Sequence, residues 1–214
     1  MLENLKYKVW EANRRLAKSG LAKFDWGSVS YFDRDTKMMV IKPDGIDFDE
    51  LVPENFTVID SNGNIIEGDR PSSDWQTHLE IYKNMDVNTV VHSFSEAAMG
   101  FAAANRPVPV FSATHARFFK GDIPATRLLT KEEIENGYYS NLGKVITETA
   151  KAPDEIPAVI VSGHEPYIWG HTIDEVVKNA AVLEAVAKSA ISALTLSPGI
   201  PPLSKTLVEF LYKG

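Results

Sequence analysis

The chain has 214 residues, 44% hydrophobic and 24% charged, which is the size and composition of an ordinary globular domain with a buried core. A net charge of -7 and a pI of about 5.3 argue against a nucleic acid or an anionic membrane as partner. Because there is no cysteine, disulfides and thiolate metal ligands are excluded, and any bound metal must be held by histidine, carboxylate and water.

The N-terminal segment gives no sign of export or membrane insertion. Residues 1–20 carry mixed charges and lack the unbroken apolar core of a signal peptide. No run in the chain approaches the roughly 20 apolar residues of a membrane helix. We therefore expect a cytoplasmic protein without a membrane partner. We also expect a single domain over residues 1–214, because no internal repeat, low-complexity segment or domain boundary is visible.

The first part of the chain predicts one helix followed by short strands. Apolar residues spaced by three and four over residues 2–18 predict an amphipathic helix that is ended by Gly20. Turn clusters rich in aspartate, asparagine and glycine separate the strand-like runs that follow. The predicted strands are residues 27–32, 38–41 and 56–59.

The middle of the chain predicts a helix, a strand and a second helix. Ser72 and Ser73 are predicted to cap a helix that runs to about Asn84. Residues 87–92 are typical of a buried strand, and residues 96–104 of a helix of small residues packed against it.

The last part predicts more strands and two helices. Thr172 and Glu175 form a capping box at the start of a long helix whose apolar stripe ends before Pro198. Helices flanking a mixed sheet, in one layered α/β domain, are the simplest architecture for this pattern. The remaining predicted elements are strands at residues 108–112 and 158–162 and a short helix at residues 203–213.

Three separated residues are candidate metal ligands: Asp74, His92 and His164. Each lies in a turn that opens a helix or at the end of an apolar strand-like run, where a side chain can enter a cleft. Two imidazoles and one carboxylate suit Zn²⁺ and leave positions open for water or substrate. The same ligand list also occurs in non-haem iron oxygenases. The alternative for each histidine is a hydrogen-bonded core or surface residue.

Several short segments resemble, in order, the L-ribulose-5-phosphate 4-epimerase branch of the class II aldolase/adducin family. The resemblance is collinear and extends from Met1 to about Leu196. Coincidence of many short motifs in one order is far more specific than any one of them. The matching segments are residues 1–6, 26–30, 41–45, 71–74, 91–93, 114–116, 121–127 and 166–170.

The resemblance implies a single layered α/β domain with a mixed, mainly antiparallel central sheet flanked by helices. It implies a homotetramer with active sites between subunits. It also implies a divalent metal, usually zinc with manganese or iron as alternatives, that polarises the carbonyl of a sugar phosphate and stabilises an enediolate when a C–C bond breaks. An aldolase releases the aldehyde, whereas an epimerase rotates it and closes the bond with inverted stereochemistry.

Individual positions carry over from the family by this resemblance. Asp74, His92 and His164 match its metal positions. The serine pair at residues 72–73 is also suited to anion binding at a helix start, with simple capping as the alternative. The positions that match the surroundings of the substrate phosphate are Lys42, Gly45, Ser72 and Ser73.

Departures from the family pattern fall on the substrate and metal positions. Phe94 stands where the family has a further metal-binding histidine, and it cannot ligate an ion. Asp44 replaces a serine or threonine of the phosphate loop, and Ser28 replaces an asparagine there. A carboxylate 4 Å from a phosphate charge would cost about 4 kcal/mol at an effective dielectric near 20.

The acid–base positions also differ. Arg117 stands where the epimerases have a proton-transferring aspartate, and an arginine stays protonated, so it could instead hold a substrate carboxylate. His115 and Glu165 are the remaining acid–base candidates in this pattern. Their alternatives are a core hydrogen-bonding histidine and a solvated carboxylate.

Two functional interpretations follow. The first is a metal-dependent aldolase or epimerase-like enzyme with a rebuilt pocket, in which Asp44 meets a hydroxyl or ammonium group of a small polyhydroxylated sugar or sugar phosphate. The second is a non-catalytic binding or assembly module on the same fold. Retention of Asp74, His92 and His164 favours the enzyme, because a decaying pocket would lose these residues as readily as the ligand at position 94.

Overall fold

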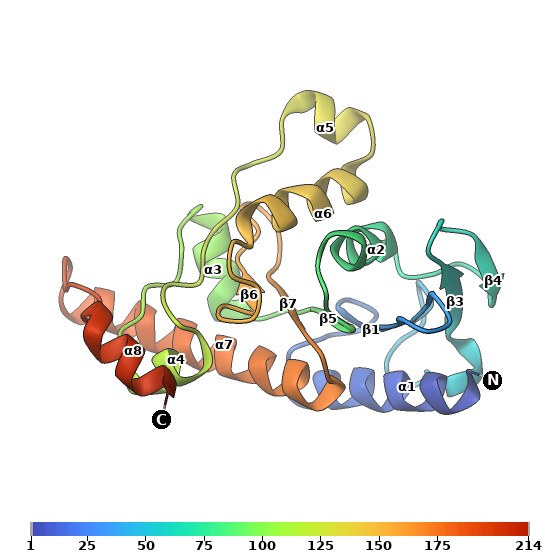
Figure 1. Cartoon of the computed structure of the whole chain (residues 1–214), viewed down its shortest axis with the longest axis horizontal. Helices are drawn as coiled ribbons and strands as arrows, with labels where there is room; N and C mark the ends of the chain where they lie inside the picture. Colours follow the sequence, from blue (N-terminus) through green and yellow to red (C-terminus); the bar gives the residue numbers. More distant parts are fainter. Residues whose placement is uncertain (1, 214) are drawn as a thin grey trace.

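A seven-stranded sheet runs through the centre of the computed structural model. The structure describes residues 2–213, and Met1 and Gly214 of the predicted domain lie outside the described residues. The strand order is β4-β3-β2-β1-β5-β7-β6, and every pairing between these strands is antiparallel. Helices cover both faces of the sheet (Figure 1). The strands are β1 (Ser28–Asp33), β2 (Met38–Ile41), β3 (Thr57–Asp60), β4 (Ile65–Glu67), β5 (Thr89–His92), β6 (Ala158–Val159) and β7 (Tyr167–Gly170).

Helices α1 and α7 lie along one face of the sheet, and α2 and α6 along the other (Figure 1). This arrangement confirms the predicted layered α/β architecture with a mainly antiparallel sheet. The parallel component is a single isolated bridge, between Ala125 and Ile160, among the residues described. The helices are α1 (Glu3–Lys18), η1 (Pro53–Asn55), α2 (Trp75–Asn84), α3 (Glu96–Ala103), α4 (Ala113–Phe118), α5 (Lys131–Glu135), α6 (Tyr138–Thr149), α7 (Ile173–Leu196) and α8 (Lys205–Lys213).

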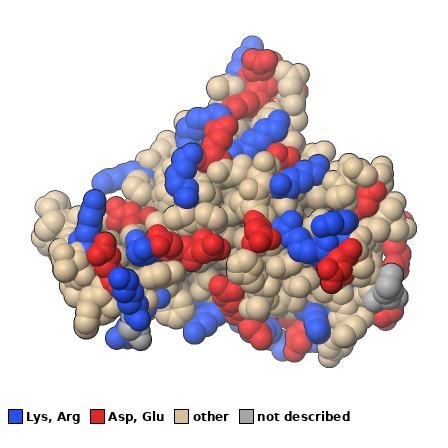
Figure 2. All heavy atoms as spheres, in the orientation of Figure 1, with Lys and Arg blue, Asp and Glu red and all other residues tan. Residues whose placement is uncertain are grey.

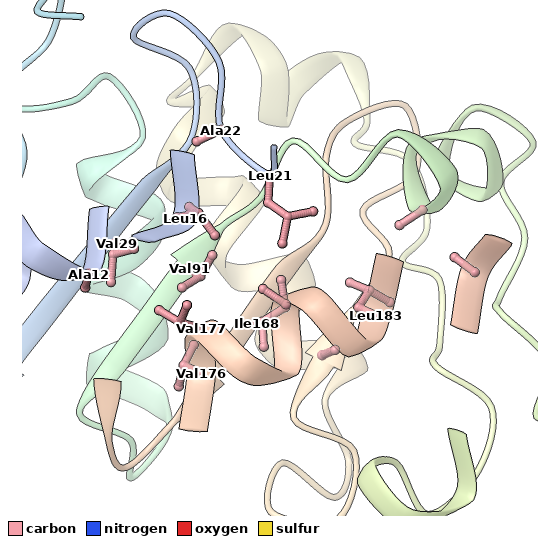
Figure 3. Packing of buried hydrophobic residues seen from close by; sticks show 14 of the residues in the cluster. Ala12, Leu16, Leu21, Ala22, Val29, Val91, Ile168, Val176, Val177 and Leu183 are labelled. Atoms are coloured by element: carbon pink, nitrogen blue, oxygen red, sulfur yellow. The ribbon is translucent and has the colours of Figure 1, made fainter. Parts of the chain in front are cut away.

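Alternation along the strands divides the core between the two faces. Val91 and Ile168 point into the cluster that α1, α3 and α7 cover, whereas their neighbours Val90 and Trp169 point into the cluster under α2 and α6. Figure 3 shows the first cluster, where Val91 and Ile168 from the sheet meet Leu183 of α7. Both faces of the central strands are buried, so β2 and β7 are almost entirely apolar, whereas β1 turns the buried Ser28 and Ser30 toward α2, where they contact His78.

Helix α7 begins at the predicted cap. Thr172 accepts a hydrogen bond from the Glu175 backbone N–H at 3.3 Å, but the Glu175 carboxylate accepts from the His171 N–H instead of completing the box on Thr172. In the described part of the chain α7 is the one helix long and apolar enough to cross a membrane. Core helices pass the same test, and Val176 and Leu183 of α7 are buried in the cluster above.

Several predicted elements are wrong in detail. Ser72 and Ser73 do not cap α2, because the helix begins at Trp75 after Asp74 and has no side-chain cap. Residues 108–112 are not a strand but make one isolated bridge, from Val108 to Ile123, since α4 follows directly. The predicted strand at 158–162 is limited to β6. Elements that the sequence did not predict are η1, β4, β7, α4, α5 and α6.

Helix α2 packs closely against α6 at Gly143, and this contact can be tested by substitution, with Gly100 of α3 as the control. A Cβ on Gly143 of α6 would lie 2.5 Å from Glu80 Cβ and 3.0 Å from the Thr77 carbonyl, whereas one on Gly100 of α3 would meet only Ile191 Cδ1 at 3.8 Å. Gly143→Ala is therefore expected to lower the free energy of unfolding by about 1 to 2 kcal/mol. Gly100→Ala is expected to raise it by up to about 1 kcal/mol. Urea unfolding measures both, and equal effects would contradict the packing.

Charges of both signs are interspersed over the face shown in Figure 2. No large area of one sign gathers on this face. This distribution agrees with the acidic composition in offering no basic footprint there for a nucleic acid.

Candidate active site

The strand register brings the candidate residues together at one end of the sheet. His92, the last residue of β5, lies opposite Ser28 of β1 and Tyr167 of β7. Cross-strand neighbours in antiparallel pairs have their side chains in contact. Gly27, just before β1, has φ +91°, and a Cβ there would lie 3.2 Å from the His92 carbonyl oxygen, so only glycine fits beside this strand end.

Asp74 lies behind His92 and is almost fully buried. It occupies the N-cap position of α2, yet its carboxylate turns away from the helix backbone. Its Oδ2 accepts hydrogen bonds from His92 Nδ1 and Ser28 Oγ, each at 2.8 Å, and lies 3.2 Å from His78 Nε2. Its Oδ1 is buried without a hydrogen-bond partner in residues 2–213. Burial alone would raise the pKa of Asp74, but the imidazoles of His78 and His92 hold it well below its ordinary value.

The hydrogen bond to Asp74 fixes the orientation of the His92 ring. With Nδ1 donating, Nε2 is the atom left to bind a ligand, which is the arrangement common for metal-binding histidines. The ring also stacks on Tyr167, with centroids 4.6 Å apart and planes at 1°. Burial lowers the pKa of His92, but the carboxylates of Asp74 and Glu165 outweigh it and raise the pKa to about 9, so a cation binding at Nε2 must displace a proton.

His92, His164 and Glu165 form a cluster whose potential ligand atoms all lie within 4.8 Å of one another. Glu165 Oε2 is 3.5 Å from His92 Nε2 and 3.0 Å from His164 Nδ1. Neither ring nitrogen makes a hydrogen bond within the described chain, although both are buried. Buried nitrogens without partners carry a cost unless something binds them, so the cluster fits a divalent cation.

The structure thus places the predicted metal ligands in two layers. His92 and His164 are in the cluster itself. Asp74, predicted as the third ligand, lies beside the cluster, where its Oδ2 accepts from His92 and Ser28 and is 3.2 Å from His78 Nε2. Glu165, predicted as an acid–base group, lies between the two imidazoles and supplies the carboxylate of the cluster. Burial and the charge of His92 lower the pKa of His164, which favours the unprotonated imidazole.

A cavity of about 370 Å³ opens beside the cluster. Phe94 lines it, with its ring 5.4 Å from that of Trp26, so the position of the missing histidine is part of an aromatic wall. Three of the predicted substrate-binding residues also line it: Asp44, Ser72 and Ser73. The full lining is Asp25, Trp26, Gly27, Asp44, Ser72, Ser73, Asp74, His92, Phe94 and Glu165.

The other three predicted substrate-binding residues are not in the cavity lining. Ser28 is buried behind Asp74. Lys42 is 1% exposed, and one of the three N–H donors of its ammonium is used by the Pro43 carbonyl at 3.0 Å. Burial lowers the pKa of Lys42 despite nearby carboxylates. Gly45 has φ +70° and faces open space, so its role is to let the loop turn.

Arg117 and His115 lie on α4, and neither lines the cavity within the described residues. Arg117 is exposed. His115 is 1% exposed, donates from Nε2 to the Gly121 carbonyl at 2.9 Å, and packs edge-on against Phe119. Burial lowers its pKa to about 4. The structure therefore makes His115 a hydrogen-bonded core residue, the alternative interpretation of its sequence.

His78 was not predicted from the sequence. It is fully buried in α2, where Nδ1 is 2.7 Å from Ser30 Oγ and Nε2 is 3.1 Å from Ser28 Oγ. Its Nε2 lies 3.2 Å from Asp74 Oδ2, the same oxygen that accepts from His92. The signal for it was the spacing of four from Asp74, which places both side chains on one helix face.

Comparisons with known proteins agree with this geometry. The sequence matches the family described as "Class II Aldolase and Adducin N-terminal domain" over residues 7–191. A solved L-fuculose 1-phosphate aldolase is 25% identical with a TM-score of 0.83, and the match covers 98% of this chain and 95% of that one. A putative aldolase/epimerase/decarboxylase from Escherichia coli, YgbL, is 19% identical with a TM-score of 0.79 and 98% coverage of both chains.

A third structure, the L-fuculose-1-phosphate aldolase from Thermus thermophilus, is 18% identical with a TM-score of 0.70, over 92% of this chain and 98% of that chain. Likeness at this level of identity supports the fold. The family match spans β1 to β7 together with every residue of the cluster. On this match, the chain belongs to the class II aldolase and adducin family.

Proposed function

We propose that this chain is a metal-dependent aldolase or epimerase-like enzyme that breaks a C–C bond in a small polyhydroxylated sugar or sugar phosphate. The observation that supports this most directly is that His92 Nε2 and His164 Nδ1 are buried, make no hydrogen bond in the described chain, and lie 3.5 Å and 3.0 Å from the same Glu165 oxygen. A module that only binds or assembles has no need to keep such groups buried and unsatisfied.

His92, His164 and Glu165 would hold the cation, which we propose is zinc, with manganese or iron as alternatives that suit the same donors. When bound, the ion would polarise a substrate carbonyl and stabilise the negative charge that develops on it. Asp74 fixes the tautomer and direction of His92, as a carboxylate behind a metal-binding histidine does. Its Oδ1 has no hydrogen-bond partner in the described chain, and Asp74 is among the cavity-lining residues, so this carboxylate would accept a hydrogen bond from a hydroxyl group of a bound sugar.

The finer assignments are also proposals. The epimerase branch rests on the short motifs in the sequence, whereas two solved relatives carry the name L-fuculose phosphate aldolase. We propose a cytoplasmic homotetramer, supported by the family and by exposed apolar side chains at the end of α7 and on α8, among them Leu196 and Phe210. In such an assembly Arg117, exposed on α4, would act at a neighbouring subunit's cavity. Light scattering on the purified protein tests the tetramer.

Metal analysis together with product stereochemistry tests the proposed function. Protein purified without chelators is expected to contain a divalent ion. It is expected to cleave or epimerise L-ribulose 5-phosphate, L-fuculose 1-phosphate or their unphosphorylated forms. Protein free of metal that remains inactive after addition of zinc, manganese or iron would support the non-catalytic module instead.

Phe94→His tests whether the ion lies beside position 94. The new imidazole is expected to add a donor and lower the Kd for the ion by about tenfold or more, a gain of roughly 1.4 kcal/mol. Phe94→Leu is the matched control, because it removes the same ring without supplying a ligand. Competition with a fluorescent chelator measures both affinities. Equal Kd values for the two variants would show that position 94 does not face the ion.

A further inference from the structure

The cavity beside the cluster is lined by several acidic side chains, and among the described residues His92 is the one lining side chain that can carry a positive charge. Four of its lining residues carry carboxylates, and none in the described part of the chain is lysine or arginine. Binding sites for phosphate groups normally supply arginine, lysine or several free backbone N–H groups. The acidic lining residues are Asp25, Asp44, Asp74 and Glu165.

Asp44 is held in place by Arg70. Its Oδ2 is 2.9 Å from Arg70 Nη2, and its backbone N–H donates to the Arg70 carbonyl at 3.0 Å. The Arg70 side chain is 81% exposed, whereas that of Asp44 is 24% exposed. The pair therefore turns the guanidinium toward solvent, while the carboxylate remains in the cavity wall.

Lys42 is close enough to interact electrostatically with Asp74, Asp25 and Asp44, but it is not in the cavity lining. Its ammonium is buried outside the cavity lining, donates to the Pro43 carbonyl and lies 5.4 Å above the centre of the Phe48 ring. Moving it into the cavity would break both interactions. A phosphate group entering the cavity would meet the Asp44 carboxylate in the lining, while the Arg70 guanidinium that pairs with this carboxylate lies toward solvent.

The rest of the lining suits an uncharged, hydroxylated molecule. Ionised carboxylates are hydrogen-bond acceptors only, so they require donors such as hydroxyl groups. The buried Asp74 Oδ1 is one such acceptor without a partner among residues 2–213, and Asp74 is 3% exposed. In the same lining, Trp26 and Phe94 present apolar ring surface to the carbon side of a ligand.

We infer that the cavity takes an unphosphorylated polyhydroxylated carbonyl compound, whose hydroxyl groups donate to Asp44 and Asp74 and whose carbon chain lies against Trp26 and Phe94. This inference rests on the proposed function and narrows its substrate class. Asp44 is the specificity-determining residue, because it accepts from a hydroxyl group and repels a phosphate at the same place.

Calorimetric titration of the metal-loaded full chain with L-ribulose and with L-ribulose 5-phosphate tests the inference. The wild-type protein is expected to bind L-ribulose more tightly, by about tenfold. In Asp44→Asn the affinity for L-ribulose 5-phosphate is expected to rise about tenfold, while that for L-ribulose does not rise. Asp44→Ser repeats the test with a smaller neutral side chain. Asp35→Asn, the same charge change in the exposed turn between β1 and β2, is expected to alter neither affinity.

Equal or tighter binding of L-ribulose 5-phosphate by the wild type overturns the inference, as does failure to bind either sugar. A metal-containing, active enzyme that prefers the phosphorylated sugar would leave the proposed function standing and remove only the substrate class. A metal-free, inactive protein that still prefers L-ribulose would remove the proposed function and leave the preference of the cavity for an unphosphorylated sugar standing. The binding measurement and the metal analysis therefore separate the two failures.

Discussion

Replacement of His92 by alanine is expected to abolish metal binding and, with it, any C–C bond cleavage. His92 supplies a buried Nε2 without a hydrogen-bond partner in the described residues, and Asp74 holds the ring in the direction of Glu165 and His164. Removing it leaves one imidazole and one carboxylate, too few protein donors for a stable site. Metal content measured by mass spectrometry after gel filtration is expected to fall to background.

His171→Ala is the control for this change. His171 is an exposed histidine at the start of α7, outside the cluster, so its loss removes an imidazole without touching the proposed ligands. The protein with alanine at position 171 is expected to keep its metal. If His92→Ala retained a full complement of the ion, the cluster would not be the metal site and the catalytic proposal would fail.

Asp74→Ala is expected to weaken metal binding by about 10- to 100-fold, although Asp74 is not in the cluster. The carboxylate fixes His92 and also accepts from Ser28, so alanine leaves the His92 ring free to turn and Ser28 Oγ without this acceptor. Folding stability is expected to fall as well, by about 3 kcal/mol, because a buried ion pair loses one partner. Chelator competition and urea unfolding measure the two effects.

Asp74→Asn separates the charge of this residue from its hydrogen bond. The amide oxygen can still accept from His92 Nδ1, so the metal affinity of Asp74→Asn is expected to lie between that of the wild type and that of Asp74→Ala. Asp35→Ala, at an exposed position, is expected to leave both metal affinity and stability unchanged. Wild-type metal affinity in Asp74→Ala would show that His92 does not depend on this carboxylate.

The layered fold was predictable because its main signals are local. The period of three to four residues in α1 and α7, and the apolar runs of β2 and β5, each lie within one segment. The short helix α4 and the two-residue strand β6 carry too few residues for a periodic signal, so α4 was not predicted and the limits of β6 were wrong. β7 has an apolar sequence that is equally compatible with a buried helix segment.

The site was predictable in its members but not in their arrangement. His92 and His164, which the sequence predicts as ligands, do lie together in the cluster, but nothing local in the sequence shows that the Asp74 carboxylate contacts His92. That contact depends on the pairing of β5 with β1 and β7, which brings Ser28 and Tyr167 beside His92. Burial also separates two helical histidines that look alike in sequence: His115 donates to a backbone carbonyl, whereas His78 supports Asp74.

The order of these residues along the chain has a mechanical consequence. His92 ends the central strand β5, whereas His164 and Glu165 come just before β7, after four helices and β6 have intervened. An ion shared by the two segments would act as a reversible cross-link that closes this long loop, comparable in effect to a disulfide in a chain that has no cysteine. The concentration of the free ion would then set the stability of the folded chain as well as its proposed activity.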